Sequence, residues 1–381
     1  MTDLLSVPST SRSTPSGTSS PRSPSTSGTH TPLSVSGTIT PLSSQVGGHQ
    51  GVQSTADGSL IIKPALPAEA AFYQQLASDA GLDELRAFTP KFLGTLTLEE
   101  RAAVAVGRAE GKGDVEGKGV SEAYKAAEKD SLVLENVSHA FARPNILDIK
   151  LGTVLYDESA TPEKRARMEE TARKTTSLET GVRLTGFQVY DNATGKPVPT
   201  GKEYGKSIKV SDLPDGMRRF FPVPSSSSTQ GLPASTLLPI LEGIRDIVEQ
   251  LRYVLSEIEL RMVGGSVLIV YEGDAGRAEE CVKWLEDRAE KAEMGLDVDE
   301  EDDDDEEEEE SEGESEGEEG GGDGVEKPKK VGAPFAVKLI DFAHTRLVPG
   351  EGPDEGVLLG LDTVLKLLAG RIEEVEALVS E

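Results

Sequence analysis

Residues 143–152 read RPNILDIKLG, and residues 336–345, far along the chain, read AVKLIDFAHT. In the first stretch Asp148 and Lys150 are two residues apart, so on an extended segment their side chains point to the same side. In the second stretch an apolar run ends at Asp341, and His344 follows shortly after it. Both stretches therefore carry charged groups on or at the end of a predicted strand.

These charged groups suggest phosphate chemistry. A carboxylate and an ammonium that converge on one cleft could handle a sugar hydroxyl and a phosphate, and Asp341 is well placed to hold Mg²⁺ during phosphoryl transfer. Each pattern also has a plainer interpretation. Asp148 and Lys150 could form a surface ion pair, and Asp341 could be a turn or helix-cap residue. The two patterns alone leave these alternatives open.

A third candidate pair lies near the start of the chain. Two extended runs, residues 45–52 and 59–63, flank an Asp-Gly turn signal and predict a β-hairpin. Lys63 ends the second run, and Glu69 lies in the first turn of a predicted helix over residues 68–76. A lysine that grips nucleotide phosphates and a glutamate that orients it would repeat the arrangement found in kinases.

The order of predicted strands and helices along the rest of the chain predicts an α+β protein of two lobes. Apolar runs and alternation predict strands over residues 131–137, 181–190, 267–271 and 336–340. Helical spacing predicts helices over residues 162–178, 237–262 and 362–368.

Composition excludes several classes of protein. The chain has 381 residues and a net charge of −29, and residues 297–319 contain 18 acidic side chains and no basic one. This balance argues against a general nucleic-acid binder. One cysteine, Cys281, cannot form an internal disulfide, so the nucleus and cytoplasm fit better than secretion. No apolar stretch is long enough to span a membrane.

Low-complexity segments set the expected domain limits. Residues 1–44 contain 29 Ser, Thr or Pro residues, and such a leader cannot bury enough apolar surface to fold. The acidic insert, residues 295–332, is expected to be disordered because its like charges repel one another and keep it extended. The ordered parts are then an N-lobe over residues 45–137, a C-lobe over residues 138–294, and a completion of that C-lobe over residues 333–381.

In this order, the motifs resemble the inositol polyphosphate kinase family, whose signature PxxxDxKxG is followed far downstream by IDF. Here these motifs stand at residues 144–152 and 340–342. LVLENVSHAF, SLETGVRLTGFQVY, YGKSI, LIVYEG and DEGVLLGLDTVLKLL extend the similarity. The short segment before SLETG, the leader and the acidic insert are similar to a fungal-type multikinase branch. The trisphosphate 3-kinase and hexakisphosphate kinase branches are the alternatives.

The resemblance implies a bilobal fold, protein-kinase-like or ATP-grasp-like, with antiparallel sheets in both lobes and a short inositol-binding helical segment at about residues 160–178. It implies phosphoryl transfer from ATP·Mg²⁺ to inositol hydroxyls. On the nucleotide side, the resemblance implies that Lys63, with Glu69 as its partner, binds the ATP phosphates, that the backbone of Glu135 and Val137 binds adenine, and that Asp148 binds the ribose. It implies that Lys150 contacts the transferred group and the inositol phosphates. It also implies that Asp341 binds the metal and that His344 lies near the acceptor sugar.

The substrate carries several phosphates, so its pocket needs lysine and arginine side chains. Lys164 and Arg167 are three residues apart on the predicted 162–178 helix and share a face. A solvated helix face, balanced by neighbouring glutamates, is the alternative. Together with the motifs, the pattern favours substrate binding by these two residues.

A different class of function is also compatible with the sequence. Acidic tracts commonly engage basic proteins such as transcription factors, so the chain could be a non-catalytic interaction protein with a kinase-like core. For the kinase hypothesis, we expect the protein to be a monomer and its substrate to be an inositol polyphosphate. Activity on phosphoinositide lipids is a third possibility that the sequence leaves open.

Overall fold

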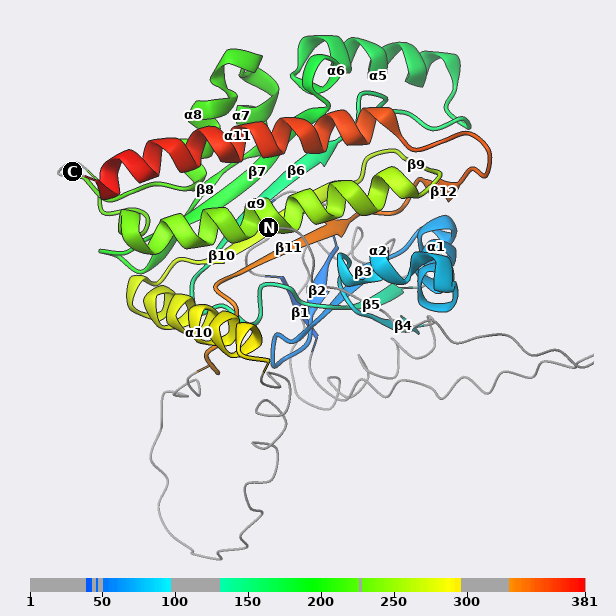
Figure 1. Cartoon of the computed structure of the whole chain (residues 1–381). Coiled ribbons are helices and arrows are strands. Elements are labelled where there is room, and N and C mark those ends of the chain that lie inside the picture. Colours follow the sequence, from blue (N-terminus) through cyan, green and yellow to red (C-terminus); the bar gives the residue numbers. More distant parts are fainter. Residues whose placement is uncertain are drawn as a thin grey trace, which may run out of the picture. The chain divides into compact units, whose positions relative to one another are not determined.

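The computed structural model of the chain describes residues 39–42, 46, 51–96, 131–225, 228–295 and 329–380. The whole acidic tract 297–319 and residues 1–38 of the leader lie outside these ranges, so the expectations for them stay predictions, while Thr40–Pro41 at the end of the leader form a short strand. The described residues form two five-stranded antiparallel sheets with helices, which confirms the expected α+β class (Figure 1).

The first sheet has the strand order β1-β2-β3-β5-β4. Its strands are β1 (Thr40–Pro41), β2 (Gln53–Ser54), β3 (Leu60–Pro64), β5 (Ser131–Glu135) and β4 (Phe92–Leu96). The predicted hairpin is present as the antiparallel pair β2–β3, but β2 is later and shorter than expected. Gly58 closes the turn with a φ of +77°, a conformation that glycine adopts without strain.

The second sheet has the order β11-β10-β6-β7-β8, with the signature strand at its centre. Its strands are β11 (Phe335–Ile340), β10 (Ser266–Glu272), β6 (Pro144–Leu151), β7 (Val182–Asp191) and β8 (Lys196–Thr200). Residues 145–149 of β6 are all buried. A strand covered on both faces is typically apolar throughout, and here Asn145 and Asp148 are the buried polar exceptions.

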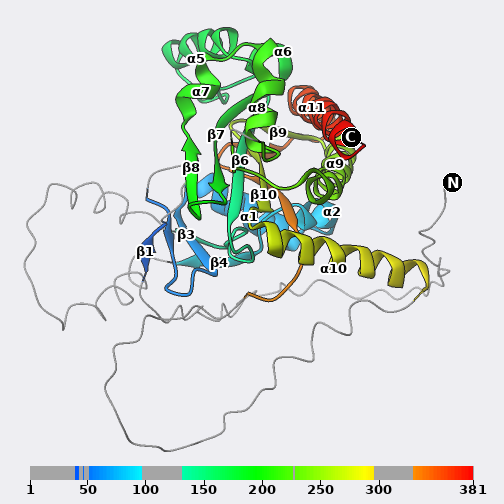
Figure 2. The same cartoon turned by 90° about the vertical axis from the view of Figure 1, so that its left-hand side faces the viewer.

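Two long helices, α9 (Ala234–Glu257) and α11 (Glu355–Val379), lie side by side against the second sheet (Figures 1 and 2). The buried residues Ile240, Ile244, Val248 and Leu251 recur every three or four positions along α9, so they form one apolar face. They belong to the same hydrophobic core as side chains of the second sheet.

The end of α9 corrects one prediction. The helix was predicted to continue to Met262, but it ends at Glu257, and β9 (Leu260–Met262) pairs with β12 (Thr345–Leu347). Leu260 and Met262 are buried while Arg261 between them is not, and this alternation is the period of a strand. The apolar residues at the end of the segment therefore obey the strand period and not the helix period.

The predicted 162–178 helix is divided into α5 (Pro162–Lys174) and α6 (Ser177–Thr180). Gly181 ends α6 at a φ of +66°, and a Cβ on Gly360 of α11 would lie 2.5 Å from the Gly181 carbonyl oxygen. The SLETG and GVLLG motifs therefore meet where two backbones touch.

The remaining helices complete the described fold. They are α1 (Pro67–Ser78), η1 (Ala80–Leu82), α2 (Asp83–Ala87), α7 (Lys202–Ser207), η2 (Val210–Asp212), α8 (Leu213–Phe220) and α10 (Ala275–Glu293). No helix in the described part of the chain is long and apolar enough to cross a membrane.

Candidate active site

Strand β3 and helix α1 bring Lys63 and Glu69 together. Pro67 occupies the first turn of α1, where its missing N–H costs no hydrogen bond, and Glu69 follows in the same turn. The Lys63 Nζ donates to Glu69 Oε1 at 2.9 Å, and both residues are buried. The sequence-based pairing of these two residues is therefore present in the structure.

Asp341 joins this pair from the end of β11. The Lys63 Nζ also donates to Asp341 Oδ1, at 2.6 Å. Among the described residues Asp341 is the one non-glycine residue with a positive φ, at +68°. Aspartate tolerates this left-handed conformation better than most residues, and it turns the carboxylate of Asp341 toward the first sheet.

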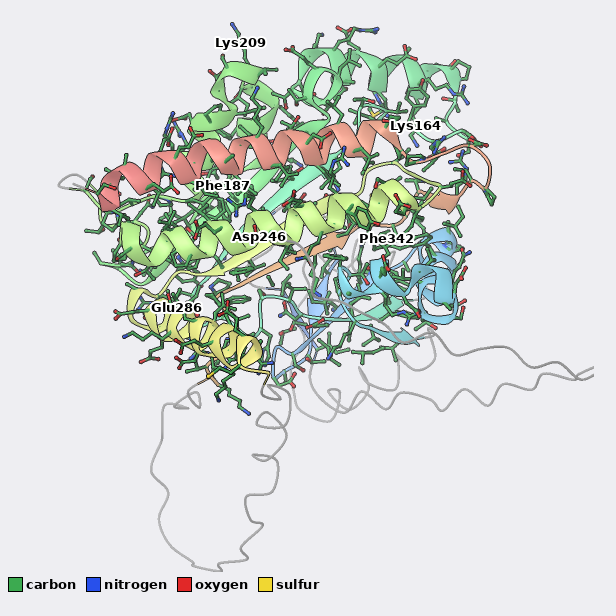
Figure 3. All side chains as sticks on the ribbon, viewed as in Figure 1. Lys164, Phe187, Lys209, Asp246, Glu286 and Phe342 are labelled. Carbon is green, nitrogen blue, oxygen red and sulfur yellow. The ribbon has the colours of Figure 1, made fainter. Side chains whose placement is uncertain are left out.

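The next residue fixes this turn. Phe342, labelled in Figure 3, is fully buried, and its ring stacks on Phe72 of α1 at a centroid distance of 4.9 Å. It also meets Tyr73 of the same helix edge-on at 5.2 Å. The aromatic residue of the IDF motif therefore anchors the end of β11 to the helix that carries Glu69.

Lys150 reaches the same carboxylate from the second sheet. Its Nζ donates to Asp341 Oδ2 at 2.8 Å and to the Gly264 carbonyl at 2.7 Å. Ion pairs thus connect Asp341 to one lysine of each sheet. Asp148, two residues before Lys150, is 1% exposed, so the surface ion pair that the sequence left open is not what these residues form.

Burial and charge oppose each other at this cluster. Burial disfavours ionisation of Asp341, but the ammonium groups of Lys150 and Lys63 outweigh it and hold the pKa of Asp341 well below its usual range. Burial also disfavours the charged form of Lys63, yet the carboxylates of Asp341 and Glu69 raise its pKa. Asp341 and Lys63 are therefore both charged at neutral pH.

Asp148 is in the opposite situation. Burial raises its pKa, and the nearby charge of Lys150 offsets this only in part. Its Oδ1 and the Oγ of Ser266 are buried and make no hydrogen bond of standard geometry with any described group. Such polar atoms are costly unless a ligand or water satisfies them.

A pocket of about 140 Å³ opens beside Lys63 and Asp341. Side chains of both sheets line it, with Ile61 and Leu134 from the first sheet and Leu268 from the second. Glu135, the last residue of β5, and Val137 of the segment between the sheets also line it. Lys63, Asp341, Glu135 and Val137 are thus brought to one pocket.

Three of the four predicted substrate residues, Lys164, Arg167 and His344, do not line this pocket. Asp157 connects two of them, because its Oδ2 is 3.0 Å from His344 Nδ1 and 3.6 Å from Lys164 Nζ. Arg167 is exposed on α5 and forms no ion pair with a described residue. Lys164 and His344 are therefore neighbours in the structure, and Arg167 is not drawn into their cluster.

Sequence reasoning missed Asp157 and Arg183. Arg183 of β7 stands directly opposite Lys150 of β6 in the strand register, and its charge acts on Asp148. Directly opposite residues on paired strands share a face, so pairing the two predicted strands could have found it. Asp157 lies in an irregular segment between Gly152 and α5, and no periodicity marks it.

Asp341 is also the candidate metal ligand. No group of three or more His, Cys, Asp or Glu side chains in the described ranges could hold a metal ion. Mg²⁺ at a nucleotide site needs only one or two carboxylates, because phosphate oxygens and water complete its coordination. An ionised carboxylate at the pocket wall fits that requirement, with the two lysines as neighbours.

Comparisons with known proteins identify the family of this chain. The model of the inositol polyphosphate kinase family matches residues 131–369. The inositol polyphosphate multikinase of Saccharomyces cerevisiae is 34% identical over 352 residues, which cover 84% of this chain and 95% of that protein. Inositol hexakisphosphate kinase 1 of Homo sapiens is 28% identical over 244 residues, which cover 62% of this chain and 51% of that protein.

A solved structure supports the same assignment. The crystal structure of inositol phosphate multikinase Ipk2 from S. cerevisiae, in complex with ADP and Mn²⁺, superposes with a TM-score of 0.52 and 27% identity. The match covers 83% of this chain and all of that chain. Since the family match contains Asp148, Lys150 and Asp341, and since the yeast multikinase matches most of the sequence, the chain belongs to the inositol polyphosphate kinase family.

Proposed function

We propose that this protein is an ATP- and Mg²⁺-dependent multikinase that phosphorylates inositol tris- and tetrakisphosphates. The observation that carries the proposal is the convergence of Lys63 and Lys150, from two different sheets, on the carboxylate of Asp341 at a pocket wall. The 34% identity to the S. cerevisiae multikinase over most of both chains supports the choice of this branch.

ATP would lie in the pocket between the two sheets. The Val137 amide makes no hydrogen bond with a described residue, so it is available to an acceptor on adenine, beside the Glu135 carbonyl. Asp148 would receive the ribose hydroxyls. Lys63, held by Glu69, would contact the phosphates. This proposal orders the groups as base, sugar and phosphate, with Asp148 buried and absent from the pocket lining.

Phosphoryl transfer requires charge neutralisation and alignment more than covalent chemistry. Lys63 and Lys150 supply two fixed ammonium groups around the place of transfer, and they need no reorganisation because Asp341 already orients them. Asp341 would hold Mg²⁺, which when bound neutralises phosphate charge. Lys150, the more exposed lysine at 18% of its side chain, would face the acceptor.

Replacing Asp148 by asparagine is expected to raise the melting temperature at pH 7 by about 2–4 °C and to weaken ATP binding about tenfold. Burial raises the pKa of Asp148 in the fold. The protonated side chain therefore contributes stability at pH values below the ordinary aspartate pKa, and this contribution is lost as the pH rises through the folded-state pKa. The difference in melting temperature should therefore vanish near pH 3, as thermal unfolding at several pH values would reveal. A variant that melts lower than the wild type at pH 7 would contradict this reading.

The acceptor would bind near Lys164 and His344. Both side chains are partly exposed and share Asp157 as a partner, so phosphate groups could replace that carboxylate. Arg167, exposed on the same helix, can approach a ligand without breaking an ion pair to a described residue. A polyanion thus meets several cations in an otherwise acidic protein.

Replacing Lys164 by methionine is expected to raise the KM for inositol 1,4,5-trisphosphate about tenfold, because one charge-assisted contact is lost. The KM for ATP should stay unchanged. Lys174→Met on the same helix is the matched control, since Lys174 pairs with Glu170 at 3.0 Å. Equal effects of both substitutions in steady-state kinetics would assign the change to net charge and not to a contact.

Chromatographic separation of products tests the proposed activity. Purified protein, ATP and Mg²⁺ are incubated separately with inositol tris-, tetrakis- and hexakisphosphates. The multikinase proposal expects tetrakis- and pentakisphosphates from the first two substrates. A product that stops at one tetrakisphosphate would indicate a 3-kinase, and conversion of hexakisphosphate alone would indicate a hexakisphosphate kinase. No phosphorylated product would favour the non-catalytic interaction protein.

Three expectations from the sequence stay predictions. They are the monomeric state, the location in nucleus and cytoplasm, and the basic protein partner of the acidic tract. The tract itself lies outside the described residues.

A further inference from the structure

A fully buried carboxylate outside the candidate active site holds the segment that joins the two sheets. Glu272 is the last residue of β10, it is 0% exposed, and it is absent from the lining of the nucleotide pocket. An ionised carboxylate is costly to bury unless several donors surround it. The donors around Glu272 therefore indicate what it is for.

One donor is local, the Asp274 N–H, which donates to Glu272 Oε1 at 3.0 Å, and two are backbone groups of the inter-sheet segment 136–143, hereafter the linker. The Ala142 N–H donates to Glu272 Oε2 at 2.7 Å, and the Arg143 N–H donates to Oε1 at 2.9 Å. The Gly273 N–H also donates to the Arg143 carbonyl, at 2.8 Å. The C-terminal end of the linker is thereby tied to the end of β10.

The N-terminal end of the linker is tied to the first sheet. The Asn136 N–H donates to the Ser59 carbonyl at 2.8 Å, and its Nδ2 donates to the Gly58 carbonyl at 2.7 Å. Between the two tied ends, Val137 lines the nucleotide pocket and packs with Phe141 in a small buried cluster. The position of the Val137 amide therefore depends on both ends of the linker.

Arg277 of α10, the helix that follows β10 (Figure 2), reinforces the C-terminal tie. Its Nε lies 3.3 Å from Glu272 Oε2, and its Nη1 donates to the Lys329 carbonyl at 2.6 Å. The Lys329 Nζ in turn donates to the Phe141 carbonyl at 2.7 Å. The guanidinium compensates the buried charge, and the chain at Lys329 adds a further contact to the linker.

We propose that Glu272, supported by Arg277, is a positioning residue for nucleotide binding. It fixes the linker so that the Val137 amide and the Glu135 carbonyl stand ready for adenine, although Glu272 itself touches no nucleotide. The inference rests on the proposed function in one respect, the binding of adenine at the linker.

The test is Glu272→Gln, which keeps the size of the side chain but turns one acceptor into a donor that faces a backbone N–H. The KM for ATP and the Kd for ADP, measured by calorimetry, are each expected to rise about tenfold. At saturating ATP, kcat and the KM for the inositol phosphate should stay within about twofold. Glu279→Gln is the matched control, because Glu279 is exposed on α10 and pairs only with Lys283 among described residues.

Two further variants separate positioning from simple stabilisation. Glu272→Asp keeps the charge with a shorter reach and should restore most of the ADP affinity, while Arg277→Lys should weaken ADP binding less than Glu272→Gln does. If the variants melt at lower temperature but bind ADP like the wild type, Glu272 is only structural and the inference is wrong. Because ADP binding is measured directly, a wild type that binds ADP yet phosphorylates no inositol phosphate would refute the proposed function alone.

Discussion

Replacing Asp341 by asparagine is expected to lower kcat for phosphoryl transfer to an inositol trisphosphate by at least about 10³-fold. The change removes the charge that holds Lys63 and Lys150 at 2.6 and 2.8 Å, and with it the candidate Mg²⁺ ligand. Asparagine is the variant of choice because it keeps the shape of aspartate and tolerates the φ of +68° at this position. Steady-state rates at saturating ATP measure the effect.

For the Asp341→Asn variant, unfolding must be distinguished from a loss of catalysis in the folded protein. Lys63 keeps Glu69 as a partner in the Asp341→Asn variant, so the first sheet and α1 should remain together. Asp362→Asn, at an exposed carboxylate of α11 that pairs with Arg252, is the control and should leave kcat unchanged. Turnover of Asp341→Asn within about threefold of the wild type would remove Asp341 from the proposed mechanism.

Replacing Lys150 by methionine is expected to lower kcat by about 10²–10³-fold, with a small change in the KM for ATP. Methionine fills much of the same space but carries no charge. The lost ammonium is the one that donates to both Asp341 Oδ2 and the Gly264 carbonyl. Its charge would be needed most when negative charge is redistributed on the transferred group.

A lysine of the neighbouring strand provides the control for Lys150. Lys338 of β11 donates to the Ala87 carbonyl at 2.8 Å and contacts neither Asp341 nor the substrate residues in the described structure. Lys338→Met should therefore retain the wild-type kcat. If both methionine variants lose activity to the same degree, the loss reflects general destabilisation and the assigned role of Lys150 is wrong.

Several longer strands and helices could be predicted because their apolar spacing is local, whereas β4, β8, β9 and β12 were not predicted. Asp148 and Lys150 were predicted to lie on an extended segment, and in the structure that segment is the largely buried strand β6. The end of α9 was missed because Leu260 and Met262 continue the apolar composition of the helix while their pairing with β12 decides the conformation. A pairing partner far along the chain is not visible in local spacing.

The candidate site also has a part that the sequence predicted and a part that it did not. The order of the motifs predicted that Lys63, Lys150 and Asp341 belong to one site, although Lys63 and Asp341 are 278 positions apart. Their actual contact depends on the packing of Phe342 against α1, which no periodicity reports. Asp157 escaped notice because it lies in an irregular segment, and its importance follows only from the positions of His344 and Lys164 around it.

The most direct measurement is transfer of radiolabel from [γ-³²P]ATP to inositol 1,4,5-trisphosphate by the wild type and by Asp341→Asn, with Mg²⁺ present and with Mg²⁺ chelated. We expect labelled tetrakis- and pentakisphosphates from the wild type with Mg²⁺, and no label above background in the other three reactions. Label transfer by Asp341→Asn at the wild-type rate, or no transfer by the wild type with Mg²⁺, would contradict a kinase site centred on Asp341.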